Sequence, residues 1–231
     1  MTKVRNSGLP SVIIHCGMSV DGRVAPAPNK TVPKDAWNLD LYIKLQRGLR
    51  CDAAMVGSNT VLELNAPRPR NKDIKNLRPE TDTLIIIPDS RGRVRWTGWQ
   101  DDPWLRGLVV LCSKATPRSY IGHLQREGIS HVIAGQNHVD LRAALKEVKE
   151  SYRVKRIVCQ GGGIINGALL RAGLVNEVSV LIAPFAVGGI DTPTLFDAPN
   201  LVSAEYMTHL KLFACKRFEE NFVWLHYQVI K

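Results

Sequence analysis

The chain of 231 residues lacks several features that would place it in a specialised class. No apolar run approaches the roughly 20 residues that span a bilayer, and the amino terminus leads into no secretory hydrophobic segment. We therefore expect a cytoplasmic protein with no membrane partner. No internal repeat, low-complexity tract or linker divides the sequence, and 45% of the residues are hydrophobic, so we predict one packed domain over residues 1–231.

Cysteine and histidine show none of the spacings that build metal sites. The five cysteines are scattered without a C-x-x-C pair, and the six histidines form no H-E-x-x-H pattern. We expect no metal, and cysteines that are reduced, buried and inert.

The formal net charge is +10, which favours anionic partners: phosphorylated metabolites, nucleotide cofactors or nucleic acid. Residues 67–78 concentrate this charge, with five Lys or Arg residues against one Asp. No aromatic residues that could stack on bases are interleaved there, so a solvated loop is the simpler interpretation and nucleic acid is the least favoured partner.

One stretch suggests a ligand directly. Residues 156–160 form a short apolar run, Gly161-Gly162-Gly163 follow, and helical periodicity resumes at Ile164. Three glycines let the backbone lie against a ligand, and the free N–H groups of a helix start attract a phosphate. The alternative is a tight strand-to-helix turn without a ligand, because the spacing matches neither G-x-G-x-x-G nor a Walker loop.

Strands and helices alternate through the first two thirds of the chain, which predicts an α/β fold with a mostly parallel sheet. Residues 36–49 read as an amphipathic helix capped by Asp35. After the glycines, residues 177–183, 206–213 and 221–230 read as strands without long helices between them. We expect these strands to extend the same sheet in antiparallel fashion.

Other polar loops follow predicted strands. Ser58-Asn59-Thr60 come directly after a strand and Gly57, and resemble a helix start over a second anion site. Asp21-Gly22 follow the first strand, where Asp21 is either an acid–base group near the site or only a turn residue.

Four of these motifs occur in the order seen in the RibD C-terminal reductase domain and in archaeal diaminopyrimidine ribosylamino-phosphate reductases. They are residues 17–25, 52–61, 161–163 and 174–184, and the resemblance spans nearly the whole chain. It implies a three-layer, dihydrofolate-reductase-like mixed sheet, an NADPH cofactor and a homodimer. The cofactor residues that it implies are Val24, Ala25, Gly57, Ser58, Asn59, Thr60, Ser90, Arg91, Gly161, Gly162, Gly163 and Ile164.

The substrate side departs from the family pattern. Gln160 stands where the family usually has Glu, and Leu64-Asn65-Ala66 stand where it usually has Asp-Asp-Pro. An amide cannot ionise, whereas the glycine turns of the family pattern are intact. We therefore expect these changes to affect substrate preference more than cofactor binding. We place Gln160 among the catalytic candidates, and Asn65, Arg68 and Arg70 at a phosphorylated small-molecule substrate.

The resemblance therefore implies an NADPH-dependent oxidoreductase of riboflavin biosynthesis, which reduces the ribosylamino group of a diaminopyrimidine 5′-phosphate to ribitylamino. The alternative is a divergent paralogue that reduces another pterin-like, pyrimidine or specialised metabolite, which Gln160 and residues 64–66 favour. A non-catalytic nucleotide or RNA binder is the least favoured hypothesis.

Overall fold

The computed structural model describes residues 8–24, 36–64, 83–94 and 105–230. Its strands are β1 (Ser11–Ser19), β2 (Ala53–Met55), β3 (Thr83–Pro88), β4 (Leu105–Cys112), β5 (Ser130–Ile133), β6 (Arg156–Cys159), β7 (Val175–Ala183), β8 (Leu210–Arg217) and β9 (Val223–Val229). Its α-helices are α1 (Leu39–Gly48), α2 (Ser58–Leu64), α3 (Arg118–Arg126), α4 (Leu141–Tyr152) and α5 (Gly163–Arg171).

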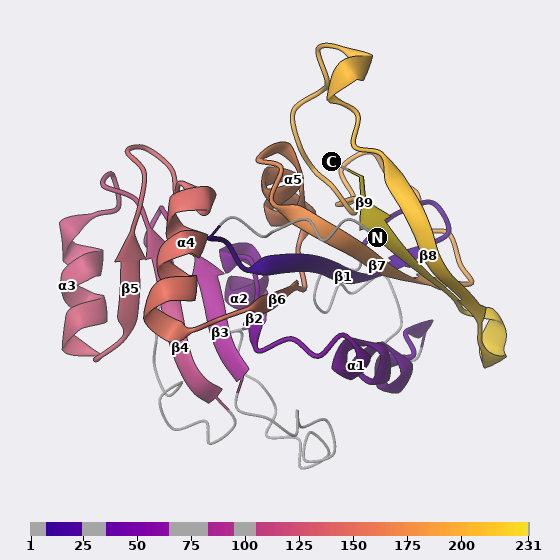
Figure 1. Ribbon diagram of the computed structural model, residues 1–231, viewed down its shortest axis with the longest axis horizontal. Helices are drawn as coiled ribbons and strands as arrows, with labels where there is room; N and C mark the ends of the chain where they lie inside the picture. The colour runs from indigo at the N-terminus through magenta and orange to yellow at the C-terminus, as the bar shows by residue number, and fades with distance from the viewer. Residues whose placement is uncertain (1–7, 25–35, 65–82, 95–104, 231) are drawn as a thin grey trace.

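All the described strands form one sheet with the order β5-β4-β3-β2-β6-β1-β7-β9-β8 (Figure 1). The strands from β5 to β7 pair in parallel, and β9 pairs antiparallel with both β7 and β8. The predicted mixed sheet, mostly parallel with antiparallel carboxyl-terminal strands, is confirmed. Its central strands are buried runs of Val, Ile and Leu, as a sheet covered on both faces requires.

Helices cover both faces of the sheet, so the fold has three layers. Alternate residues of a strand point to opposite faces, and β1 shows the division. Val12 and Ile14 pack in the main core with residues of α4 and α5, whereas Ile13 packs with Leu49 and Ala54 on the α1 side. The helices α2 and α3 cover the α1 side of β3 and β4.

Two predicted elements need correction. Helix α1 begins at Leu39, and its cap is Asn38, whose side chain accepts a hydrogen bond from Leu41 N at 2.9 Å; the predicted cap Asp35 lies outside the described residues. The strand predicted over residues 206–213 is found at Leu210–Arg217, because Ala204–Tyr206 form a short 3-10 helix that Ser203 caps.

The β8 edge of the sheet exposes large apolar side chains. Phe213 is 75% exposed, Leu212 51% and Met207, just before the strand, 52%. The predicted burial of the cysteines is confirmed for Cys16, Cys112 and Cys159 but is wrong for Cys215, which is exposed on this strand, and Cys51 is half-buried. Separately, no described helix combines the length and apolarity that a membrane span requires.

Candidate active site

The carboxyl ends of β2 and β6 meet at a point where the chain leaves the sheet in opposite directions. The two strands are parallel neighbours, yet α2 follows β2 on one face and α5 follows β6 on the other. In open α/β sheets, ligands bind in the crevice that such diverging connections create. The predicted motifs at Gly57–Thr60 and Gly161–Gly163 both lie at this crevice.

The two glycine turns contact each other directly. Gly57 N donates to Gly161 O at 3.0 Å, and Gly161 has a φ of 77°, in the left-handed region that favours glycine. Among the described residues, a Cβ on Gly162 would meet only Thr60 Oγ1, at 3.9 Å. The backbone at Gly162 is therefore open on the side of α2. The starts of α2 and α5 both carry partial positive charge there, which suits an anion.

Gly163 is needed for a different reason. A Cβ on this residue would collide with the Asp197 carboxylate and the Thr194 carbonyl oxygen. Asp197 N donates to Gly163 O at 3.0 Å, and the Asp197 carboxylate accepts from Thr194 N and Thr194 Oγ1. Gly163 thus permits a loop of the protein itself to pack on α5.

The buried side chain of Asn166 fixes the first turn of α5 against the sheet and the loop at Leu195. It is fully buried, and its Nδ2 donates to Leu195 O at 3.0 Å and to Cys16 Sγ at 3.4 Å, while its Oδ1 accepts from Cys159 Sγ at 3.3 Å. Burial raises the pKa of Cys16 to about 11 and the pKa of Cys159 further, so both remain thiols at neutral pH.

A guanidinium that sequence reasoning missed reaches the start of α2. Arg93, after β3, donates to Asn59 Oδ1 at 2.5 Å and to Ser58 Oγ at 3.2 Å. The buried Asp89 carboxylate shapes this loop, because it accepts from Arg93 N and Val94 N at 2.8 and 2.9 Å. A cation beside the positive end of a helix is unfavourable by itself, so this arrangement favours an anion between them.

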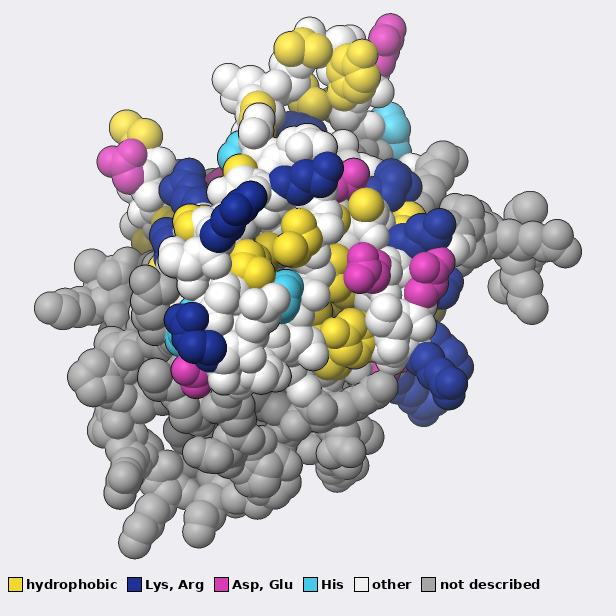
Figure 2. Space-filling model, turned by 90° about the vertical axis from the view of Figure 1, so that its left-hand side faces the viewer, with side chains coloured by type: hydrophobic (Ala, Val, Ile, Leu, Met, Phe, Trp, Pro, Cys, Tyr) yellow, Lys and Arg dark blue, Asp and Glu magenta, His cyan; other side chains and the backbone are white. Residues whose placement is uncertain are grey.

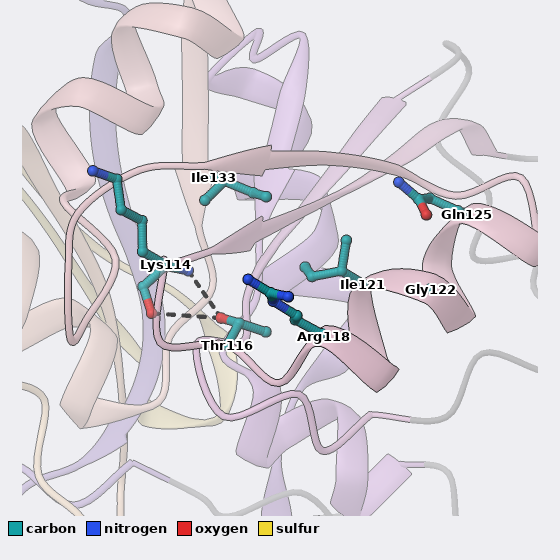
Figure 3. A pocket seen from close by; sticks show the side chains of 8 residues that line it. Lys114, Thr116, Arg118, Ile121, Gly122, Gln125 and Ile133 are labelled. Carbon is teal, nitrogen blue, oxygen red and sulfur yellow. Dashed lines mark hydrogen bonds between the residues drawn. The ribbon is translucent and has the colours of Figure 1, made fainter.

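The predicted residues Ser90 and Arg91 lie in the same loop as Arg93, at the end of β3. Ser90 O accepts from Thr116 Oγ1 at 2.9 Å, and Arg91 is exposed. Thr116 also belongs to a shallow hollow of about 330 Å³, which Lys114, Arg118 and Ile133 help to line (Figure 3). Basic side chains surround exposed apolar ones on this side of the molecule (Figure 2). The hollow and the glycine turns therefore lie on opposite sides of β3 in the sheet order.

The structure gives Asp21 a role in loop anchoring. Its carboxylate accepts hydrogen bonds from Ser19 Oγ at 2.5 Å, from Val187 N at 3.0 Å and from Gly188 N at 2.7 Å. These bonds, the one from Ser19 first, hold the pKa of Asp21 well below its usual range. The carboxylate is therefore ionised and engaged near neutral pH, and an acid–base role for Asp21 remains a prediction without support from its contacts.

Gln160, immediately before the glycines, points towards α1. Its Nε2 donates to Gln46 Oε1 at 2.7 Å, and its side chain also interacts with the Tyr42 hydroxyl. That hydroxyl donates to His15 O at 2.9 Å. No sequence signal marked Gln46 or Tyr42, because each reads as an ordinary position of an amphipathic helix.

A buried hydrogen-bond chain continues behind Tyr42. Trp224 Nε1 can only donate and bonds Ser179 Oγ at 2.8 Å, so the Ser179 proton is free for His15 Nδ1 at 2.9 Å. His15 Nε2 then carries the proton that it donates to Tyr42 O at 3.2 Å. Burial is the main cause that lowers the pKa of His15 to about 4, so this imidazole is neutral near pH 7.

The buried His15 predicts a pH-dependent stability. Because its folded-state pKa is about 4 and its unfolded value 6.5, the unfolded chain binds more protons as the pH falls. We expect His15 to lower the free energy of unfolding by about 2 kcal/mol between pH 7 and pH 5. Urea denaturation measures this, with His15→Gln expected to lose that part of the pH dependence. The partly exposed His131→Gln is the control, and an equal slope in His15→Gln and the wild type would contradict the expectation.

The remaining predicted residues are divided between the crevice and undescribed segments. Val24 is 7% exposed and bridges to Met18 at the end of β1, whereas Ile164 is 64% exposed at the start of α5. Ala25 and the substrate candidates Asn65, Arg68 and Arg70 lie outside the described residues.

Comparison with known proteins agrees with this architecture. Residues 10–224 match the model of the RibD C-terminal domain. The chain is 31% identical over 198 residues to the 2,5-diamino-6-ribosylamino-4(3H)-pyrimidinone 5′-phosphate reductase of Methanothermobacter thermautotrophicus, covering 83% of this chain and 86% of that protein.

Solved structures show the same fold. A pyrimidine reductase-like protein from Corynebacterium diphtheriae superposes with a TM-score of 0.69 at 20% identity, over 96% of this chain and 92% of that one. Dihydrofolate reductase from Enterococcus faecalis, complexed with NADP(H), gives a TM-score of 0.52 at 10% identity, over 96% and 97% of the two chains.

The protein is an oxidoreductase with the dihydrofolate-reductase-like fold, since its fold is that of the reductase structures and its sequence relatives are reductases. Within that class, the chain belongs to the RibD C-terminal domain family.

Proposed function

We propose that this protein is an NADPH-dependent reductase of riboflavin biosynthesis, acting on 2,5-diamino-6-ribosylamino-4(3H)-pyrimidinone 5′-phosphate. The observation that carries the proposal is the paired glycine turn at the switch between β2 and β6, in a chain 31% identical to a reductase of that name. Hydride reduction at C1 of the ribosyl group and a proton on the ring oxygen would give the open-chain ribityl product.

The described residues fit a nicotinamide dinucleotide. The backbone at Gly162 is open towards Thr60, two helix starts face the crevice, and Arg93 adds a positive charge. Gly162 and the two helix starts would bind the pyrophosphate. Arg93, held at the start of α2, would bind the 2′-phosphate in place of the predicted Arg91, and Ser90 lies in the same loop for the adenosine ribose. The cofactor supplies the hydride when bound. The predicted Val24 and Ala25 would lie near its carboxamide.

The protein's own contribution is positioning and exclusion of water. Trp37 closes over the end of β1, where a Cβ on Gly17 would lie 3.1 Å from its ring. Neither His15 nor Asp21 suits a proton donor, because His15 is neutral and hydrogen-bonded and the Asp21 carboxylate is ionised. Arg68 and Arg70 are the proposed contacts of the substrate phosphate, with Asn65 nearby in sequence.

We also propose a cytoplasmic homodimer. Met207, Leu212 and Phe213 expose large apolar side chains at the β8 edge of the sheet, which supports a contact between two copies at this edge.

The function is tested by following NADPH absorbance with the purified protein and 2,5-diamino-6-ribosylamino-4(3H)-pyrimidinone 5′-phosphate. We expect turnover with NADPH and much slower turnover with NADH, which lacks the 2′-phosphate that Arg side chains prefer. Tight NADPH binding without turnover would reject this substrate and favour a paralogue with another one, as the Gln46–Gln160 pair also suggests.

A further inference from the structure

We infer that Gln46 is a positioning residue for Gln160, and that the Gln160 carbonyl oxygen is an uncharged acceptor for an N–H or O–H group of the substrate. The inference rests on the proposed function, because it assigns Gln160 to the substrate side of the crevice. Gln160 joins the two halves of the site: its backbone N donates to Met55 O at the end of β2, and its side chain reaches Gln46 in the last turns of α1.

The contacts of the Gln160 amide fix its orientation. One N–H of Nε2 donates to Gln46 Oε1 at 2.7 Å. The Tyr42 hydroxyl also interacts with this side chain, and its own proton is donated to His15 O at 2.9 Å. Only lone pairs of that hydroxyl are then left for Gln160, and lone pairs accept an N–H. The Nε2 end of the Gln160 amide therefore faces α1.

The orientation leaves Gln160 Oε1 with no hydrogen-bond partner among the described residues. Gln160 as a whole is half-buried, directly before the glycine turn at the crevice, so we place this oxygen where a substrate can reach it. It can accept a hydrogen bond, as a carboxylate would, but it carries no charge and does not titrate. The amino groups and ribosyl hydroxyls of the proposed substrate are donors of the matching kind.

The support behind the pair is rigid. Tyr42 stacks on His15 with a centroid separation of 4.3 Å, and His15 is fixed by Ser179, which Trp224 bonds in turn. Tyr42 cannot move away without breaking this buried chain. Gln46 lies one turn after Tyr42 on α1, and its amide oxygen is the acceptor that turns the Gln160 Nε2 towards α1.

The first experiment tests the orientation without turnover. Nitrogen-15 NMR reports the side-chain amide signals of Gln160 in the full chain. Gln46→Met removes the acceptor, so we expect these signals to shift; Gln46→Glu restores an acceptor oxygen and is expected to restore them. Gln125→Met is the matched control, because Gln125 is exposed on α3. Unchanged Gln160 signals in Gln46→Met would overturn the positioning role whether or not the protein turns over the proposed substrate.

The second experiment uses steady-state kinetics. We expect Gln160→Met and Gln46→Met each to raise the substrate KM about tenfold, the cost of about one lost hydrogen bond, with the NADPH dissociation constant changed less than about twofold. The substrate KM of the double variant should be little higher than that of either single variant, because the two residues act as one unit. Gln46→Glu should recover most of the lost affinity. Normal substrate KM in Gln160→Met, with a turning-over wild type, would overturn the acceptor role and leave the proposed function standing.

Discussion

Replacing Gly162 by valine is expected to weaken NADPH binding at least about a hundredfold while leaving the fold intact. In the described part of the chain, the Cβ direction of Gly162 meets nothing but Thr60 Oγ1 at 3.9 Å, so the two methyl groups would occupy the space between the starts of α2 and α5. They would exclude a phosphate and its hydrogen bonds to the backbone, each of which contributes roughly 1.5–3 kcal/mol when the acceptor is charged. Fluorescence titration with NADPH measures the loss.

The neighbouring glycine gives the matched comparison. Gly163→Ala would direct a Cβ into Asp197 and Thr194, so its main effect falls on stability. Overpacking of this kind costs about 1–3 kcal/mol, or a fall in Tm of roughly 2–12 °C in a chain of this size. Gly162→Val should keep its Tm within about 2 °C of the wild type. If Gly162→Val unfolded the protein and Gly163→Ala did not, the roles assigned to the two glycines would be reversed.

Removing the Arg93 guanidinium is expected to raise the NADPH dissociation constant about 10- to 100-fold, with a much smaller change for NADH. Arg93 is held at the start of α2 by Ser58 and Asn59, and charge-assisted bonds to a phosphate contribute roughly 1.5–3 kcal/mol. Arg93→Met keeps most of the aliphatic stem and removes only the charged group. Titration with both dinucleotides gives the two constants.

Arg91 is the control for Arg93, because it lies two residues earlier in the same exposed turn. Arg91→Met should change the NADPH constant less than about threefold, since no described contact directs it to α2. The opposite result, a large loss of NADPH affinity in Arg91→Met and none in Arg93→Met, would contradict the role of Arg93. It would support Arg91 as the cofactor contact, as the family resemblance implies.

Much of the fold could be predicted because its buried strands can be recognised from the local sequence alone. Residues 83–88 form a strand with the predicted bounds, and β7 and β9 were located to within two residues at each end. Buried parallel strands are continuous apolar runs between polar loops, so their positions depend mainly on local sequence. The strand, glycine turn and helix start at residues 156–171 are also as predicted, whereas the role of the glycines in binding a ligand stays a prediction.

The contacts that complete the site could not be predicted, because they depend on which elements become neighbours. Gln46 and Gln160 are 114 positions apart, and Arg93 and Asn59 are 34 apart. The amphipathic pattern of α1 indicates which side faces the sheet, but not which strand end lies beneath its last turn. Similarly, β8 starts later than predicted because Ser203 caps a 3-10 helix, and this choice is decided by local hydrogen bonds within an apolar segment.

Because the cysteines differ in burial, they differ in their reactivity towards thiol reagents. Burial raises the pKa of Cys16 to about 11 and of Cys112 to about 12, whereas Cys215 is exposed on β8 beside the apolar side chains. Since the thiolate is the reactive form, we expect a maleimide dye to attach first to Cys215 in the folded monomer. The natural sequence therefore carries its own attachment point for a fluorophore on the face proposed to join two subunits, without any engineered cysteine.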